Sequence, residues 1–288
     1  MKISLFSKVI LDHPLEDAMR LAAEVGYEGI ELIGRSPHLA ADIDLDRLRE
    51  VKELATQLKL PIVNIPSYIG QYGQVGKEEA QGRFEEFQRF VQIADLLGCR
   101  YVRHIPASVS PDQATDQDWE LEMEWVRRVA DYAARYGVYM VLEMHGRSLI
   151  ETAESTRKYL GMAGADNLVV TYDVGNLYLA RADYGPEALE KIARYVHIVH
   201  VRDHASWGDD GRAPGTLMGD GVIDYTPILE YLRDTGFDGY LSVECELFAT
   251  SVASELSYEV PTTSLSSAEI IAHEYKAIRA LLGRTMTR

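Results

Sequence analysis

The sequence predicts an α/β protein in which a single domain forms a (β/α)8 TIM barrel, and three observations support this fold class. Short runs of β-branched and other apolar residues alternate eight times with amphipathic stretches along the 288 residues. Several of these runs are apolar on both faces, as expected for parallel strands that helices cover. No Pro- or Ser-rich linker interrupts the alternation, and the length is slightly above the roughly 250 residues typical of one barrel.

The first half of the chain contains four strand–helix pairs. The predicted strands are residues 2–6, 29–33, 61–66 and 100–105, and the predicted helices are residues 15–25, 45–58, 78–97 and 119–136. Pro14 precedes the first helix and Gly26 follows it, which is typical of helix ends. Gly98 and Gly137 follow the third and fourth helices in the same way. Residues 68–76 form a loop rich in Gly and Tyr, of the kind that covers a site.

The second half repeats the pattern. The predicted strands are residues 138–143, 168–173, 195–203 and 239–244, and the predicted helices are residues 152–162, 186–194, 226–235 and 268–282. A long Gly-rich loop occupies residues 205–221. Residues 249–266 have no clear periodicity, so we expect an irregular insert there that serves as a lid or a subunit contact.

The strand YVHIVHVRD, residues 195–203, carries polar side chains to the predicted active-site end of the barrel. Strand alternation places His200 and Arg202 on one face, so both emerge at the carboxyl end of the strand. Active sites of (β/α)8 barrels lie at this end.

Four consecutive predicted strands end with a residue that can bind a metal, namely Glu143, Asp173, His200 and Glu244. A buried unpaired charge costs several kcal/mol, so each of these side chains needs a partner. Three carboxylates and one imidazole that converge predict one divalent metal ion, with Mn²⁺ expected first and Mg²⁺ or Co²⁺ as alternatives. The structural alternative is that each carboxylate pairs with an arginine at the rim of the barrel.

Five motifs follow one another at the strand ends: VLEMHG, YDVGN, HVRD, GDGVIDY and GYLSVE. In this order they resemble the sugar phosphate isomerase/epimerase family, with its xylose-isomerase-like barrel, over essentially the whole chain. The resemblance implies that Glu143, Asp173, His200 and Glu244 hold one ion. It also implies that Glu143 and Glu244 face the substrate carbon from opposite sides as proton donor and acceptor. A carboxylate in that role contributes about 10²–10⁴-fold to the rate.

Two positions depart from the family pattern. Many members carry His where this chain has Asn176 and where it has Ile198. An Asn side chain can hydrogen-bond a substrate hydroxyl group, but it cannot relay a proton. These differences leave open how far the detailed ketose-epimerase mechanism applies.

Further polar side chains at the same rim are candidates for substrate contact. His145 shares a strand face with Glu143, which predicts a general acid or base or a partner of a substrate hydroxyl group. We expect Glu31 to pair with a neighbouring strand and Glu246 to orient Glu244. The candidate substrate-binding residues are Asn64, His104, Asn176, Arg202 and Arg212. For each of them the structural alternative is a hydrogen-bonded rim residue or an arginine paired with an acid.

Composition excludes several classes of function. The chain has 29 basic and 45 acidic side chains and a formal net charge of −16, which opposes binding to nucleic acid and to anionic membranes. No stretch approaches the 18 apolar residues of a membrane span, and the N-terminus lacks the pattern of a signal peptide. Cys99 and Cys245 lie in strand-like runs and are expected to be buried thiols. We therefore expect a soluble, cytoplasmic protein, and the family resemblance implies a homodimer or homotetramer.

Together, the residues and the resemblance predict a divalent-metal-dependent isomerase or epimerase that acts on a sugar, sugar acid or cyclitol. Proton abstraction α to a carbonyl group would give an enediolate, which reprotonation converts to an isomer. If the same intermediate expels a β-hydroxyl group instead, the enzyme is a dehydratase or lyase of the inosose or dehydroshikimate type. A non-catalytic binding subunit is a more distant alternative, because fold alone does not establish a reaction.

Overall fold

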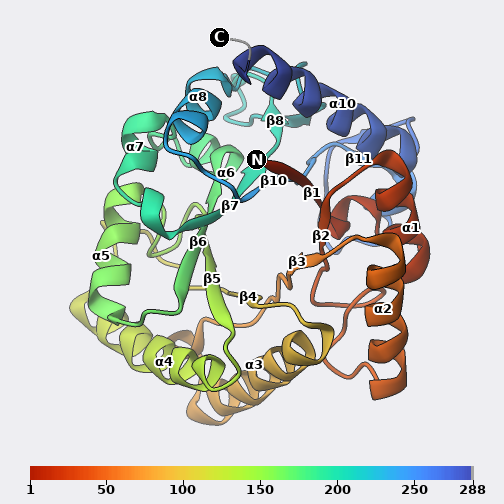
Figure 1. Ribbon diagram of the computed structural model, residues 1–288. Helices are drawn as coiled ribbons and strands as arrows, with labels where there is room; N and C mark the ends of the chain where they lie inside the picture. The colour runs from red at the N-terminus through yellow and green to blue at the C-terminus, as the bar shows by residue number, and fades with distance from the viewer. Residues whose placement is uncertain (287–288) are drawn as a thin grey trace.

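The computed structural model describes residues 1–286, in which eight parallel strands form a nearly closed barrel inside a ring of helices (Figure 1). The barrel strands are β1 (Lys2–Phe6), β2 (Gly29–Glu31), β3 (Ile62–Asn64), β4 (Tyr101–His104), β5 (Tyr139–Glu143), β6 (Leu168–Asp173), β7 (Val196–Val201) and β10 (Tyr240–Val243). Their spatial order is β3-β2-β1-β10-β7-β6-β5-β4. A bridge between Ile65 and Val102 joins the two ends of the sheet, and the Ile65 N–H donates to the Tyr101 carbonyl oxygen at 2.9 Å. The predicted TIM barrel is confirmed.

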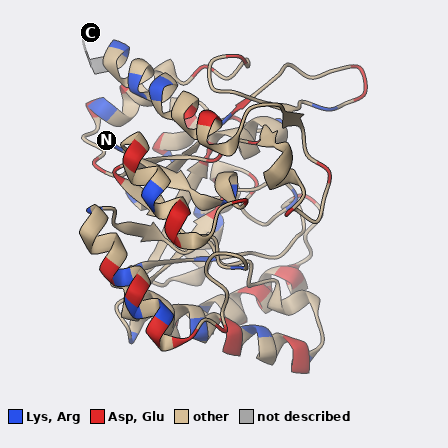
Figure 2. Ribbon diagram, turned by 90° about the vertical axis from the view of Figure 1, so that its right-hand side faces the viewer, with Lys and Arg blue, Asp and Glu red and all other residues tan. Residues whose placement is uncertain are grey.

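The outer layer follows the predicted helices closely. Its helices are α1 (Leu15–Val25), α2 (Leu45–Leu58), α3 (Lys77–Leu97), α4 (Asp116–Ala134), α5 (Ala153–Ala163), α7 (Pro186–Glu190), α8 (Thr226–Asp234) and α10 (Ser267–Met286). Helix α4 begins earlier than the apolar pattern indicated, because the side chains of Thr115 and Asp118 form a capping box. Acidic and basic residues are interspersed along the outer helices (Figure 2). No helix in residues 1–286 is long and apolar enough to cross a membrane.

Four segments differ from the sequence-based expectation. Helix α6 (Val174–Leu179) directly follows β6, because the Asp173 carboxylate accepts a hydrogen bond from the Asn176 N–H at 2.7 Å and caps the helix. The helix predicted over residues 186–194 ends at Glu190 and is followed by a 3-10 turn at Ala193–Tyr195. Two segments expected to be irregular contain short elements, namely β8 (Asp203–His204), β9 (Gly215–Thr216), β11 (Phe248–Ala249), α9 (Thr250–Ala253) and β12 (Thr262–Thr263).

Candidate functional site

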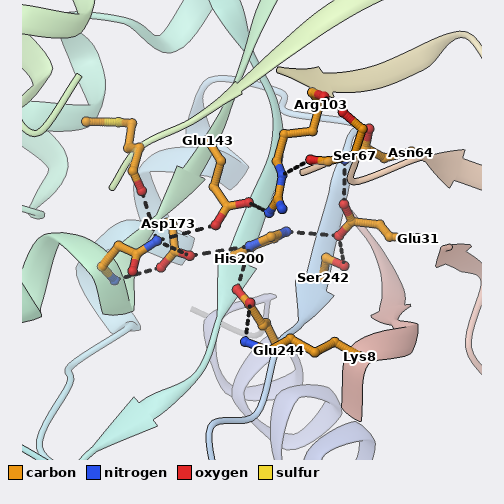
Figure 3. Close-up of polar contacts among 12 residues, drawn as sticks. Lys8, Glu31, Asn64, Ser67, Arg103, Glu143, Asp173, His200, Ser242 and Glu244 are labelled. Carbon is orange, nitrogen blue, oxygen red and sulfur yellow. Dashed lines mark hydrogen bonds and ion pairs between the residues drawn. The ribbon is translucent and has the colours of Figure 1, made fainter. Parts of the chain in front are cut away.

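The four predicted metal-binding residues lie together at the carboxyl ends of β5, β6, β7 and β10 (Figure 3). One potential ligand atom from each of Glu143, Asp173, His200 and Glu244 lies within 4.8 Å of the others. Strand register explains the convergence, since His200 is paired with Asp173 on β6 and with Ser242 on β10. All four side chains are buried. We call these residues the carboxylate–histidine cluster.

Hydrogen bonds fix the orientation of the His200 ring. Its Nε2 donates to Glu31 Oε1 at 2.9 Å. Glu31 also accepts hydrogen bonds from Asn64 Nδ2 at 2.7 Å and from the Ser242 hydroxyl group. Nδ1 therefore faces the cluster, 2.9 Å from Glu244 Oε2 and 3.4 Å from Asp173 Oδ2. A carboxylate that holds the outer nitrogen of a histidine is the usual support of a metal-binding imidazole.

The geometry of the cluster fits a divalent cation. An imidazole protonated only at Nε2 would direct the Nδ1 lone pair of His200 at two carboxylates, so a proton or a metal ion has to lie between them. Glu244 Oε2 is buried, and its contacts with the described residues are the ion pairs with His200 Nδ1 at 2.9 Å and Arg202 Nη1 at 3.4 Å. Three carboxylates and one imidazole nitrogen form a donor set that divalent metal ions accept. The carboxylate–histidine cluster could hold such an ion.

Basic side chains also contact these carboxylates. Arg202 Nη2 lies 2.6 Å from Asp173 Oδ2, and its Nη1 lies 2.9 Å from Glu246 Oε1. Lys8 Nζ lies 2.7 Å from Glu246 Oε1 and 3.5 Å from Glu244 Oε1. On the other side of the cluster, the Arg103 guanidinium group pairs with Glu143. The rim arginines considered from the sequence are therefore present alongside the metal-type ligands.

These contacts shift the pKa values of the buried groups. Burial alone would raise the pKa of Glu244, but Arg202 and Lys8 lower it well below its ordinary range. Burial would lower the pKa of His200, whereas the neighbouring carboxylates, Glu31 foremost, raise it well above its ordinary value. Both shifts favour the charged forms, a carboxylate at Glu244 and an imidazolium at His200.

A cavity of about 670 Å³ opens above the carboxylate–histidine cluster. The predicted residues that line it, besides Glu143 and Glu244, are His104, His145, Asn176 and Arg202. The Asn176 side chain donates to the Met144 carbonyl oxygen at 3.0 Å and to Asp173 Oδ2 at 2.9 Å, so it also braces the cluster. His145 is exposed at the rim. His104 Nε2 donates to the buried Glu122 at 3.3 Å.

Two expected substrate contacts lie elsewhere, and the structure corrects them. Asn64 is only 1% exposed and supports Glu31 from behind the cluster. Asn64 is the polar residue of the predicted strand PIVNIP, residues 61–66, and nothing in the sequence indicated that Glu31 would accept its hydrogen bond. Arg212 is exposed in the loop between β8 and β9, outside the cavity lining. Its N–H donates to Asp210 Oδ1 at 3.1 Å in a local turn.

Sequence reasoning missed two site residues, Lys8 and Arg103. Both are buried and contact cluster carboxylates. Each carried a signal, since Lys8 lies two residues after β1 and Arg103 is a charged residue inside the apolar run of β4. A buried charge at a strand end implies an oppositely charged partner.

Comparisons with known proteins agree with this geometry. A family model described as "xylose isomerase-like TIM barrel" matches residues 19–269. An inosose dehydratase of Geobacillus kaustophilus is 24% identical over 267 residues, which span 78% of this chain and 86% of the relative. A fructoselysine 3-epimerase of Shigella flexneri is 22% identical over 239 residues, or 80% and 85% of the two chains. The crystal structure of the IOLI protein with a bound zinc atom superposes with a TM-score of 0.79 and 19% identity, covering 99% of both chains.

Proposed function

The chain belongs to the xylose isomerase-like TIM barrel family, and from this membership we propose that it is a divalent-metal-dependent isomerase or epimerase of a polyhydroxylated carbonyl compound. The substrate class is a sugar, sugar acid or cyclitol. The observation that carries the proposal is the convergence of Glu143, Asp173, His200 and Glu244 within 4.8 Å at the floor of a cavity. We propose Mn²⁺ as the ion, with Mg²⁺ or Co²⁺ as alternatives.

In this proposal, two carboxylates of the carboxylate–histidine cluster move the proton. A divalent ion held there would polarise a carbonyl oxygen and stabilise the negative charge that develops when the adjacent carbon loses a proton. Glu143 and Glu244 come from β5 and β10, which β6 and β7 separate, so they reach the cavity from different directions. One of them can remove a proton from one face of the substrate carbon, and the other can return a proton to the opposite face.

A dehydratase is the second candidate, and His145 favours it. Its ring lines the cavity beside Glu143, and its Nδ1 donates to the Gly146 carbonyl oxygen at 2.7 Å. Nε2 makes no hydrogen bond with residues 1–286. A protonated Nε2 would be able to give a proton to a departing hydroxyl group. Inosose dehydratases are among the relatives.

Metal titration followed by isotope exchange tests the proposal. We expect one Mn²⁺ per chain in the wild type, and loss of binding in Glu143→Gln and His200→Ala. Glu154→Gln is the matched control, since this glutamate on α5 pairs with Lys191 far from the cluster. The metal-loaded enzyme is then incubated in D₂O with ketoses and inososes, and the masses of the products are measured by mass spectrometry.

The products separate the two reactions. Deuterium at the carbon next to the carbonyl group, with all oxygens retained, supports an isomerase or epimerase. Loss of water supports the dehydratase. A folded wild type that binds no divalent ion would overturn the metal-dependent reaction and favour a binding subunit.

A further inference from the structure

The cavity reverses the charge balance of the chain. The whole sequence has 29 basic and 45 acidic side chains. Among the described residues that line the cavity, the basic ones are Lys8, Arg35, Arg103, Arg147 and Arg202, and the acidic ones are Glu143, Glu244 and Glu246. Cations therefore outnumber carboxylates around this cavity.

Ion pairs with the site carboxylates account for Lys8, Arg103 and Arg202, but not for the remaining two cations. The side chains of Arg35 and Arg147 make no ion pair or hydrogen bond with residues 1–286. Arg103 is only partly engaged. Its Nη1 pairs with Glu143 and its Nε donates to the Ser67 carbonyl oxygen at 3.2 Å (Figure 3). Its Nη2 makes no hydrogen bond with the described residues.

One aromatic ring, that of Tyr68, contacts two of these arginines. The Cζ atom of Arg35 lies 4.6 Å from the centroid of the Tyr68 ring, and that of Arg103 lies 4.5 Å from the same centroid. Cation–π contacts of this length restrict guanidinium groups without neutralising their charge. Both guanidinium groups therefore contact the Tyr68 ring, and of the two only Arg103 is also paired with a carboxylate, that of Glu143.

This arrangement divides the cavity into two walls. Arg35 follows β2, Tyr68 follows β3, and Arg103 belongs to β4. We call these three residues the cationic wall. The carboxylate–histidine cluster occupies β5, β6, β7 and β10. A ligand that spans the cavity would meet different chemistry at its two ends.

We propose that the substrate carries an anionic group, a carboxylate or a phosphate, that binds at the cationic wall. The planar guanidinium groups of Arg35 and Arg103 match the oxygens of such groups, and Arg147 adds positive charge at the rim. The position of the reacting carbonyl end at the carboxylate–histidine cluster rests on the proposed function. The anion site itself stands on the cationic wall alone. A cation held by Glu143 would also compete with Arg103 for that carboxylate, which frees Arg103 for the ligand.

Three ligands with the same six-carbon chain test the proposal: D-glucitol, which is neutral, D-gluconate and D-glucitol 6-phosphate. Each is titrated by calorimetry into the full chain, with and without Mn²⁺. We expect at least one anion to bind at least about tenfold more tightly than glucitol, since charge-assisted hydrogen bonds are the strong ones. The tighter of the two anions identifies carboxylate or phosphate as the recognised group.

Variants locate the anion site. We expect Arg35→Gln to lose about tenfold in affinity for the preferred anion and to leave glucitol binding unchanged. Arg147→Gln, at an exposed rim position, should show a smaller loss in the same direction and serves as a second variant if Arg35→Gln folds poorly. Arg128→Gln is the matched control, because this guanidinium lies 4.4 Å from the centroid of the Phe84 ring, outside the cavity.

The outcomes separate this inference from the proposed function. Equal binding of glucitol and the anions, or no binding of any of them, overturns the anion site even if Mn²⁺ binds. Anion preference that Arg128→Gln abolishes as fully as Arg35→Gln also overturns it. Selective anion binding by a chain that takes up no Mn²⁺ supports the anion site and contradicts the metal-dependent reaction.

Discussion

The hydrogen bond between Glu31 and His200 offers a quantitative test of the carboxylate–histidine cluster. Glu31 is fully buried and accepts hydrogen bonds from His200, Asn64 and Ser242. Glu31→Gln removes its charge and keeps its shape. The new amide group would face the Asn64 amide, but Asn64 Oδ1 has no hydrogen-bond partner among the described residues. Rotation of the Asn64 side chain would therefore accommodate the change.

The expected effect is a loss of metal affinity with little change in fold. Removing a residue that orients a metal ligand costs about 10- to 100-fold in affinity, or about 1.4–2.7 kcal/mol. The glutamine oxygen can still accept the hydrogen bond from His200 Nε2, which spans 2.9 Å in the wild type. Only the charge is lost, so we expect the lower end of this range, about tenfold.

Competition between the protein and a fluorescent chelator for Mn²⁺ measures this difference, and circular dichroism checks the fold. Glu122→Gln is the matched control, because Glu122 is also buried and also accepts a hydrogen bond from a histidine, His104, away from the cluster. Its Mn²⁺ affinity should equal that of the wild type. If the folded Glu31→Gln variant binds Mn²⁺ as tightly as the wild type, the Glu31 carboxylate does not increase the affinity of His200 for the metal, and the reasoning is refuted.

Two further substitutions test other parts of the structure. Burial raises the pKa of Glu274 from its ordinary 4.5 to about 7, so the folded state binds this proton more tightly than the unfolded state. Its contribution to stability is complete below pH 4.5 and is lost as the pH rises to about 7, by about 3 kcal/mol. In urea unfolding at pH 5 and pH 8, Glu274→Gln should flatten this dependence, and the exposed Glu120→Gln should retain it. Gly175→Ala would place a Cβ 2.4 Å from Arg202 Nε and destabilise the fold by about 1–3 kcal/mol. Gly161→Ala, with nothing within 4 Å, should be neutral or stabilising by the same assay, and equal effects at both positions would contradict the predicted clash.

The sequence was sufficient for the barrel and for the carboxylate–histidine cluster because both depend on local pattern. Alternation of apolar runs and helical stretches defines a (β/α)8 barrel. In a parallel barrel, residues at the carboxyl ends of neighbouring strands meet at one rim. For this reason the sequence alone was enough to group Glu143, Asp173, His200 and Glu244. Helix α6 was missed because its cap, Asp173, is also the last residue of a strand.

Partners distant in the sequence were harder to predict. Lys8 contacts Glu244 across 236 positions, and Glu31 contacts His200 across 169. The pairing of charged side chains depends on their rotamers and on the curvature of the barrel. Strand alternation predicts neither of these. For the same reason Asn64 was expected to meet substrate, whereas it hydrogen-bonds Glu31.

The two halves of the barrel differ in strand length and in the pairing between their strands. β2 and β3 have three residues each, and β3 reaches β4 only through isolated bridges such as Ile65–Val102 within the described chain. By contrast, β6 and β7 have six residues each. Regions with few ladder hydrogen bonds open at lower free energy. The cationic wall thus lies on the half of the barrel with the shorter strands, which opens at the lower free energy, whereas Glu143, Asp173 and His200 lie on the longer strands β5, β6 and β7.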